Sequence, residues 1–174
     1  MVQSLEELEK WHSNQDPWFY KDTPDDLNRR EILRGVIPER RYKQVLDIGC
    51  GQGFITQILP GENILGIDIS NEAIQKAKKH ESNTCKFQQN SIFDFEPKDK
   101  KYDLIIITGV LYEQYIGKSL CLIYDYINSW LNIDGVLISV HIDEWYDAKF
   151  PFFTYRSLYY KYRNYTHKLE VYIK

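Results

Sequence analysis

The sequence has few cysteines, no long apolar segment and no excess of positive charge. Its three cysteines, Cys50, Cys85 and Cys121, are far apart in the chain, which argues against a disulfide framework or a zinc site and favours reduced thiols. No apolar run approaches the ~20 residues that cross a bilayer, and residues 1–10 (MVQSLEELEK) lack the apolar core of a signal peptide. The net charge of −3 argues against a dedicated nucleic-acid binder, because phosphate contacts need a basic surplus. We therefore expect a cytoplasmic protein with no membrane and no nucleic-acid partner.

Length and composition are those of one folded domain. The 174 residues are 43% hydrophobic and 27% charged, so a core can form without crosslinks and wholesale disorder is excluded. The sequence shows no internal repeat and no low-complexity tract.

Short apolar runs alternate with helical stretches along most of the chain. We expect five strands at residues 44–48, 63–69, 85–89, 102–108 and 135–141. Helices are expected at residues 54–59, 71–80 and 120–131, the second of them capped by Ser70. The tail, residues 159–165 and 168–174, reads as a closing pair of edge strands. Strands that alternate with helices predict an α/β fold with a parallel sheet.

The region before the first expected strand, residues 1–41, lies outside this alternation. Leu5, Leu8 and Trp11 share one helix face, and a second helix is expected at residues 25–34. An aromatic turn, residues 16–20, joins the two. We expect residues 1–41 to form a helical and aromatic cap over the active site.

A glycine-rich turn, VLDIGCGQG at residues 45–53, carries the strongest functional signal. A strand that runs into such a turn lets the backbone approach a ligand closely. The spacing is G-x-G-x-G, with Phe54 where a dinucleotide-binding turn has its third glycine. The turn therefore suits a nucleoside without phosphates, and Asp47 could accept hydrogen bonds from an amino group.

Asp68 ends the second expected strand, 17 residues after Gly51. An acid at about this distance is placed to bind ribose hydroxyls through both carboxylate oxygens. The alternative is a plain strand–helix turn followed by an unrelated acid, but strand, turn, helix and acid come in the order that a nucleoside site requires.

Three segments together, VLDIGCGQG, GIDIS and YDLIIITGVLYE, resemble the class I S-adenosylmethionine-dependent methyltransferases over residues 44–141. The resemblance implies a Rossmann-like, mostly parallel seven-stranded sheet in the order 3-2-1-4-5-7-6, with residues 42–174 as the cofactor-binding domain. It implies that S-adenosyl-L-methionine is held at its methionine part by Asp47, Gly49, Cys50, Gly51 and Gly53. It also implies Asp68 at the ribose, Ile69, Asn90, Ser91 and Ile92 around the adenine, and Thr108 and Val110 under the sulfonium.

A narrower likeness is to the nodulation-type N-methyltransferases and their small-molecule relatives. It rests on Asp16-Pro17-Trp18 with Tyr20, and on Val110-Leu111-Tyr112 after the fourth expected strand. Gly109 stands where that group usually has a glutamate, so the likeness does not carry over an amine acceptor.

Candidate catalytic groups follow the fourth and fifth expected strands, where ligands bind in open α/β sheets. A hydroxyl acceptor needs a general base, and His141 is the first candidate because its ordinary pKa lies near neutrality. The alternative is a strand-end histidine bonded to backbone. Tyr112 and Glu113 are further candidates. Tyr20 is expected to close over the substrate or else to anchor the cap. No matching pair of ligands follows the fourth strand, so no metal is expected.

These observations predict a monomeric or homodimeric methyltransferase acting on nitrogen or oxygen of a small polar metabolite, such as a sugar or amino sugar. Methylation of RNA or of a protein side chain is the alternative within enzymes. An inactive, methyltransferase-like binding module is the alternative outside them.

Overall fold

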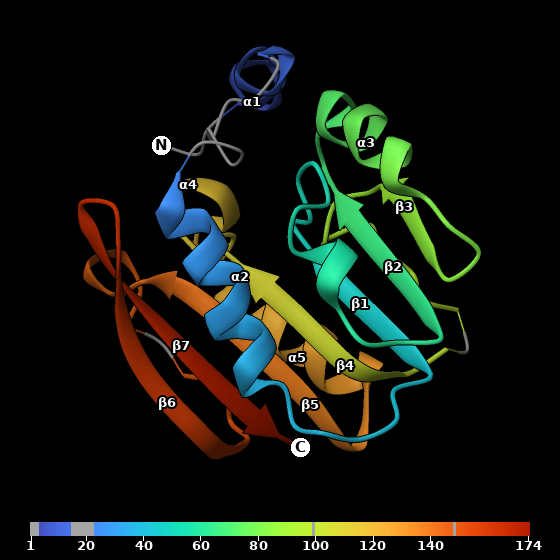
Figure 1. Cartoon of the computed structure of the whole chain (residues 1–174), viewed down its shortest axis with the longest axis vertical. Coiled ribbons are helices and arrows are strands. Elements are labelled where there is room, and N and C mark those ends of the chain that lie inside the picture. The colour runs from blue at the N-terminus through green and yellow to red at the C-terminus, as the bar shows by residue number, and fades with distance from the viewer. Residues whose placement is uncertain (1–3, 15–22, 99, 148) are drawn as a thin grey trace.

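The computed structural model describes residues 4–14, 23–98, 100–147 and 149–174. They form one seven-stranded sheet in the order β3-β2-β1-β4-β5-β7-β6 (Figure 1). The strands are β1 Gln44–Ile48, β2 Asn63–Asp68, β3 Cys85–Gln89, β4 Tyr102–Thr108, β5 Leu131–Ile142, β6 Phe153–Tyr162 and β7 Tyr165–Ile173. β7 runs antiparallel to β5 and β6, and the other neighbours are parallel. The expected fold class and strand order are confirmed.

The helices are short and lie mostly between strands. They are α1 Leu5–Ser13, α2 Pro24–Val36, α3 Asn71–Ala77, α4 Glu113–Ile116 and α5 Leu120–Trp130, with single 3₁₀ turns η1 Thr56–Ile58, η2 Lys78–His80 and η3 Asp143–Trp145. Ser70 caps α3 as predicted, because its Oγ accepts from Ala73 N at 3.1 Å. None of the helices in the described part of the chain has the length and apolar character needed to cross a membrane.

Three expected elements differ from the structure. The pair of edge strands expected at residues 159–165 and 168–174 is wrong in its bounds and place: β6 and β7 span Phe153–Tyr162 and Tyr165–Ile173, and β7 lies between β5 and β6, so only β6 is an edge strand. The helix predicted at residues 54–59 is wrong, since only the 3₁₀ turn η1 forms there. Pro60 follows at once and disfavours helical backbone at the preceding residue. β5 begins at Leu131 rather than at residue 135, because Leu131 already pairs with Tyr102 before an irregularity in the β4–β5 ladder.

The core lies on both faces of the sheet. Alternate residues of β4 serve the two sides: Ile105 and Ile107 pack in the cluster that includes α5, and Leu104 and Ile106 pack in the cluster that includes α2. Figure 1 shows α2 crossing one face with α5 behind the sheet. This two-sided cover explains the unbroken apolar run of β4.

A buried polar contact joins α2 to the hairpin of β6 and β7. Asp26 is fully buried; its Oδ1 accepts from Tyr162 Oη at 2.6 Å and its Oδ2 accepts from Arg163 Nη2 at 2.8 Å. The contact anchors the first turn of α2 to the end of β6 and to the turn that follows it.

Tyr162→Phe is therefore expected to lower the free energy of unfolding by about 1–3 kcal/mol, because a buried carboxylate oxygen loses its donor. Urea unfolding measures the change. Tyr159→Phe on the same strand is the control, since Tyr159 is 58% exposed and its removal should change stability by less than about 0.5 kcal/mol. Equal effects of the two substitutions would contradict the prediction.

Candidate functional site

The glycine turn follows β1 at the carboxyl edge of the sheet and is held by β2. The amides of Gly49 and Cys50 both donate to Ile67 O, at 2.9 and 3.0 Å. Gly49, Gly51 and Gly53 all have positive φ, at 72°, 53° and 80°. Residues other than glycine adopt such backbone angles only at a cost in free energy.

The three glycines meet different surroundings. A Cβ at Gly49 would lie 2.2 Å from Val110 Cγ2, and one at Gly53 would lie 2.7 Å from Phe87 Cζ. A Cβ at Gly51 would meet nothing within 4 Å. Gly49 and Gly53 are thus required by packing inside the protein, whereas Gly51 presents open backbone that a ligand can approach.

Asp47 supplies a buried acceptor beneath this turn. Its Oδ2 accepts from Thr56 Oγ1 at 2.6 Å, and its Oδ1 is buried without a hydrogen-bond partner in the described structure. Burial raises the pKa of Asp47 to about 6. A buried carboxylate oxygen without a donor is costly, and the ammonium group of an amino-acid ligand is a donor that would satisfy it. The site therefore fits the methionine part of S-adenosylmethionine.

Asp68 lies at the end of β2 against the same turn. Its Oδ2 accepts from Gly51 N at 2.8 Å and its Oδ1 from Ser70 N at 2.9 Å. Burial raises its pKa. A carboxylate has about four acceptor positions, so these two bonds orient the group and leave acceptor capacity on both oxygens for ribose hydroxyls.

The remaining predicted cofactor residues lie at the ends of four neighbouring strands, β1 to β4, at the same edge. Cys50 is a buried free cysteine within the turn, and Ile69, after β2, is 41% exposed. The segment after β3 is fixed by Asn90 N, which donates to Asp68 O at 2.8 Å; Ser91 is half-buried and Ile92 is buried. After β4, Thr108 is 9% exposed and Val110 is half-buried against Gly49.

His141 is buried at the carboxyl end of β5. Its Nε2 accepts from Leu111 N at 3.2 Å, and its Nδ1 lies 3.0 Å from Ser139 Oγ. Because Nε2 accepts, the proton of the neutral ring belongs on Nδ1. Burial lowers the pKa of His141 to about 3. This geometry matches the alternative reading of a strand-end histidine bonded to backbone, since Nε2 holds the loop after β4 through Leu111 N and Nδ1 is engaged by Ser139 of the same strand.

The other predicted catalytic groups are placed differently. Tyr112 is 7% exposed, its Oη accepts from Ile142 N at 2.8 Å, and burial raises its pKa to about 12. Its ring contacts His141 and Trp145 edge to face. Glu113 is exposed at the first turn of α4. Tyr20 and the aromatic turn at 16–20 lie outside the described residues.

Sequence reasoning missed Arg29. Arg29 lies on α2, with its guanidinium 5.5 Å from the ring centre of Tyr162 and a hydrogen bond to Tyr160. Burial is the main cause of the raised pKa of Asp47, and the charge of Arg29 partly opposes it. Arg29 thus lies between the glycine turn and the β6–β7 hairpin. The sequence signal was slight: a basic residue on the helix before the glycine strand.

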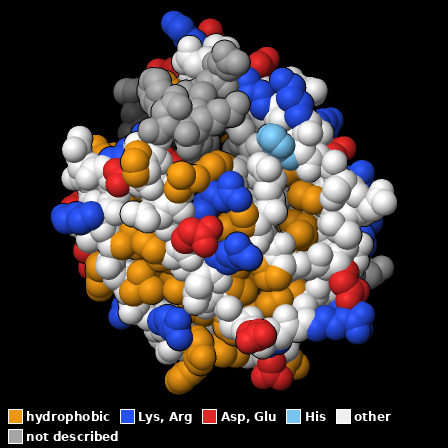
Figure 2. Space-filling model, in the orientation of Figure 1, with side chains coloured by type: hydrophobic (Ala, Val, Ile, Leu, Met, Phe, Trp, Pro, Cys, Tyr) orange, Lys and Arg blue, Asp and Glu red, His pale blue; other side chains and the backbone are white. Residues whose placement is uncertain are grey.

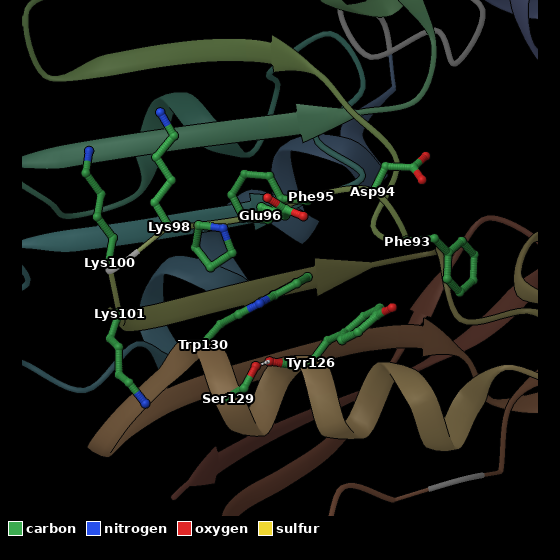
Figure 3. Close-up of a pocket in the computed structure, with 11 residues that line it drawn as sticks. Phe93, Asp94, Phe95, Glu96, Lys98, Lys100, Lys101, Tyr126, Ser129 and Trp130 are labelled. Atoms are coloured by element: carbon green, nitrogen blue, oxygen red, sulfur yellow. Dashed lines mark hydrogen bonds between the residues drawn. The ribbon is translucent and has the colours of Figure 1, made fainter.

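A separate groove of about 850 Å³ runs between α5 and residues 93–98, 100 and 101 (Figure 3). Tyr126 and Trp130 stack along it, with ring centres 5.3 Å apart. None of the predicted site residues lines it, and Figure 3 shows the side chains of Lys98 and Lys100 pointing away from the two rings. Within the described ranges, no cluster of three or more His, Cys, Asp or Glu side chains is arranged to hold a metal ion.

Comparison with known proteins places the chain in a family. Residues 40–168 match the model of a methyltransferase domain. Trans-aconitate 2-methyltransferase of Deinococcus radiodurans is 34% identical over 83 residues, which is 45% of this chain and 31% of that protein. Nodulation protein S of Azorhizobium caulinodans is 29% identical over 109 residues, 56% of this chain and 48% of that protein. The chain thus spans less than half the length of either relative.

The fold has a similar solved structure. The N-methyltransferase NodS from Bradyrhizobium japonicum WM9, in complex with S-adenosyl-L-homocysteine, superposes with a TM-score of 0.83 at 20% identity. The match covers 98% of this chain and 97% of that chain. At this identity the likeness concerns the arrangement of the elements.

Proposed function

The chain belongs to the methyltransferase-domain family, and from this premise we propose that it transfers a methyl group from S-adenosyl-L-methionine to nitrogen or oxygen of a small polar metabolite. The observation that carries the proposal is the pairing of an open backbone at Gly51 with the unpartnered, buried Oδ1 of Asp47. The relatives whose names include small acceptors support the choice of a small metabolite.

The described residues divide the cofactor between them. Asp47 accepts a hydrogen bond from the ammonium group of the cofactor's methionine part. Arg29 on α2 is the cation that faces the carboxylate of that same part. Asp68, oriented by Gly51 N and Ser70 N, binds the ribose hydroxyls. Ile69 and Ile92 flank the adenine. The bound cofactor supplies an activated methyl group, and the protein's work is to hold it in line with the acceptor.

The acceptor side lies toward β4, β5 and the β6–β7 hairpin. An amine needs to arrive deprotonated and shielded from water, whereas a hydroxyl needs a proton acceptor. Nε2 of His141 would have to give up Leu111 N to act as that acceptor, so we assign His141 to supporting the loop after β4. Tyr112 contributes a wall of the acceptor site, and Glu113 is the exposed carboxylate beside it. Tyr20 and the cap at residues 1–41 are proposed to cover the acceptor.

Macromolecular acceptors are less favoured by the surface. On the face drawn in Figure 2, basic and acidic side chains are interspersed, with hydrophobic groups between them. Such a face does not present the basic stripe by which RNA is bound.

The test is methyl transfer from labelled S-adenosylmethionine to pooled small metabolites, with total RNA and protein extracts in parallel. Label on a small acceptor, at a rate that changes little with salt, supports the proposal. Labelling of RNA at a rate that falls steeply with salt would contradict the proposal and indicate that the chain methylates RNA. Binding of S-adenosylhomocysteine without turnover on any pool would point to an inactive binding module.

A further inference from the structure

The N-terminal helix α1 is tied to α3, more than 60 residues further along the chain. Glu9 Oε2 accepts from Ser70 Oγ at 2.7 Å and from Glu72 N at 3.1 Å, and its Oε1 accepts from Asn71 N at 2.7 Å. At the other end of α3, Lys76 Nζ donates to carbonyl oxygens at the end of α1. Each helix thus satisfies backbone groups that the other leaves open at its end.

Polar contacts, rather than an apolar face, hold α1 in place. The predicted face with Leu5 and Trp11 is not buried, because these side chains keep 46% and 45% of their surface exposed. A helix of nine residues is too short to be stable alone. Burial raises the pKa of Glu9, but the hydrogen bonds from Ser70, Glu72 and Asn71 outweigh it and the pKa is lowered. The order of α1 therefore depends on these polar contacts, among which Glu9 accepts three hydrogen bonds.

The same contacts reach the predicted ribose site. Ser70 donates its amide to Asp68 Oδ1 and its hydroxyl to Glu9, so one residue links the carboxylate of α1 to that of β2. His12 of α1 is buried beside Asp68. Burial lowers the pKa of His12 and raises that of Asp68, and each charge partly opposes the shift of the other. Helix α1 thus lies against Asp68 as well as against α3, and Figure 1 shows α1 next to α3.

We propose that Glu9 is a positioning residue for the cofactor: by fixing α1 on Ser70 and α3, it completes the ribose end of the site around Asp68. This inference rests on the proposed function. Since binding and docking are linked, the cofactor stabilises the docked helix by the same factor by which docking raises cofactor affinity.

Calorimetric titration of the full chain with S-adenosylhomocysteine tests the inference. We expect Glu9→Ala to weaken binding at least tenfold, and Glu9→Gln, which keeps one acceptor oxygen, to lie between Glu9→Ala and the wild type. Glu6→Gln changes an exposed acid on the same helix and should bind like the wild type. Wild-type affinity in Glu9→Ala would overturn the inference and leave the proposed function standing, whereas no binding by the wild type would overturn both.

Hydrogen exchange gives a second readout, the change in amide exchange rate on adding ligand. If Glu9 had only a structural role, the ligand would not change this rate. Amides of residues 5–13 in the wild type are expected to exchange more slowly when S-adenosylhomocysteine is added, and those of Glu9→Ala to show no such slowing. This measurement on the wild type decides the matter even where Glu9→Ala does not fold. Exchange of residues 5–13 that is indifferent to the ligand in the wild type, in a sample that binds it, contradicts the coupling.

Discussion

Gly51→Val is expected to abolish binding of S-adenosylhomocysteine while the chain still folds. A Cβ at this position meets no protein atom within 4 Å, so the side chain enters the space that a ligand occupies rather than the core. Its positive φ of 53° adds a backbone cost of about 1–2 kcal/mol, which is less than the roughly 5–15 kcal/mol by which an ordinary domain is stable. We expect binding to weaken at least a thousandfold in calorimetric titration, with a cooperative thermal transition retained.

Two further variants separate occlusion from backbone strain. Gly51→Asn places a side chain in the same space but tolerates left-handed backbone, so it should lose binding with a smaller loss of stability. Gly53→Ala should have the opposite effects: it should keep more of the binding and lose more stability. Its Cβ would lie 2.7 Å from the ring of Phe87, and stability should fall by more than in Gly51→Asn. Tight binding by both Gly51 variants would remove the glycine turn from the cofactor site.

The parts of the fold that were predicted are those fixed by local sequence. β1, β3 and β4 lie where they were expected, because buried parallel strands are short apolar runs bounded by turn residues. The helix expected at residues 54–59 failed because Pro60 disfavours helical backbone at the preceding residue, and the segment is held instead by a tertiary contact in which Thr56 Oγ1 donates to Asp47 Oδ2. The early start of β5 at Leu131 likewise depends on its pairing with β4.

The site divides in the same way. Asp47, the three glycines and Asp68 could be found because strand and turn place them together within a short stretch of chain. Glu9 could not, because it meets Ser70 only after α1 docks 61 residues away from it in the sequence. Arg29 likewise reaches the site only through the packing of α2. His141 was singled out for its ordinary pKa, and burial, which the sequence does not show, lowers that pKa to about 3.

Asp47→Asn is expected to separate cofactor binding from folding. Burial raises the pKa of Asp47 from 3.8 to about 6, so its ionisation opposes folding: the stability present below pH 4 is lost as pH rises through about 6. At pH 7 the loss is about 3 kcal/mol. Asparagine carries no charge, and urea unfolding at pH 7 should find the ligand-free variant at least as stable as the wild type. Binding of S-adenosylhomocysteine should weaken at least a hundredfold, because the ammonium loses its charged acceptor.

The pH dependence of binding identifies the group responsible. Only the ionised carboxylate attracts the ammonium, so wild-type affinity should fall as pH is lowered from 7 to 5, and Asp47→Asn should show no such fall. Asp134→Asn, an exposed acid with positive φ that asparagine tolerates, is the matched control and should follow the wild type. Wild-type affinity that is flat across this range would show that Oδ1 of Asp47 holds no ammonium. A buried carboxylate that lowers the stability of the ligand-free protein is retained for what it binds, and the loss of binding together with the gain in stability would show this directly.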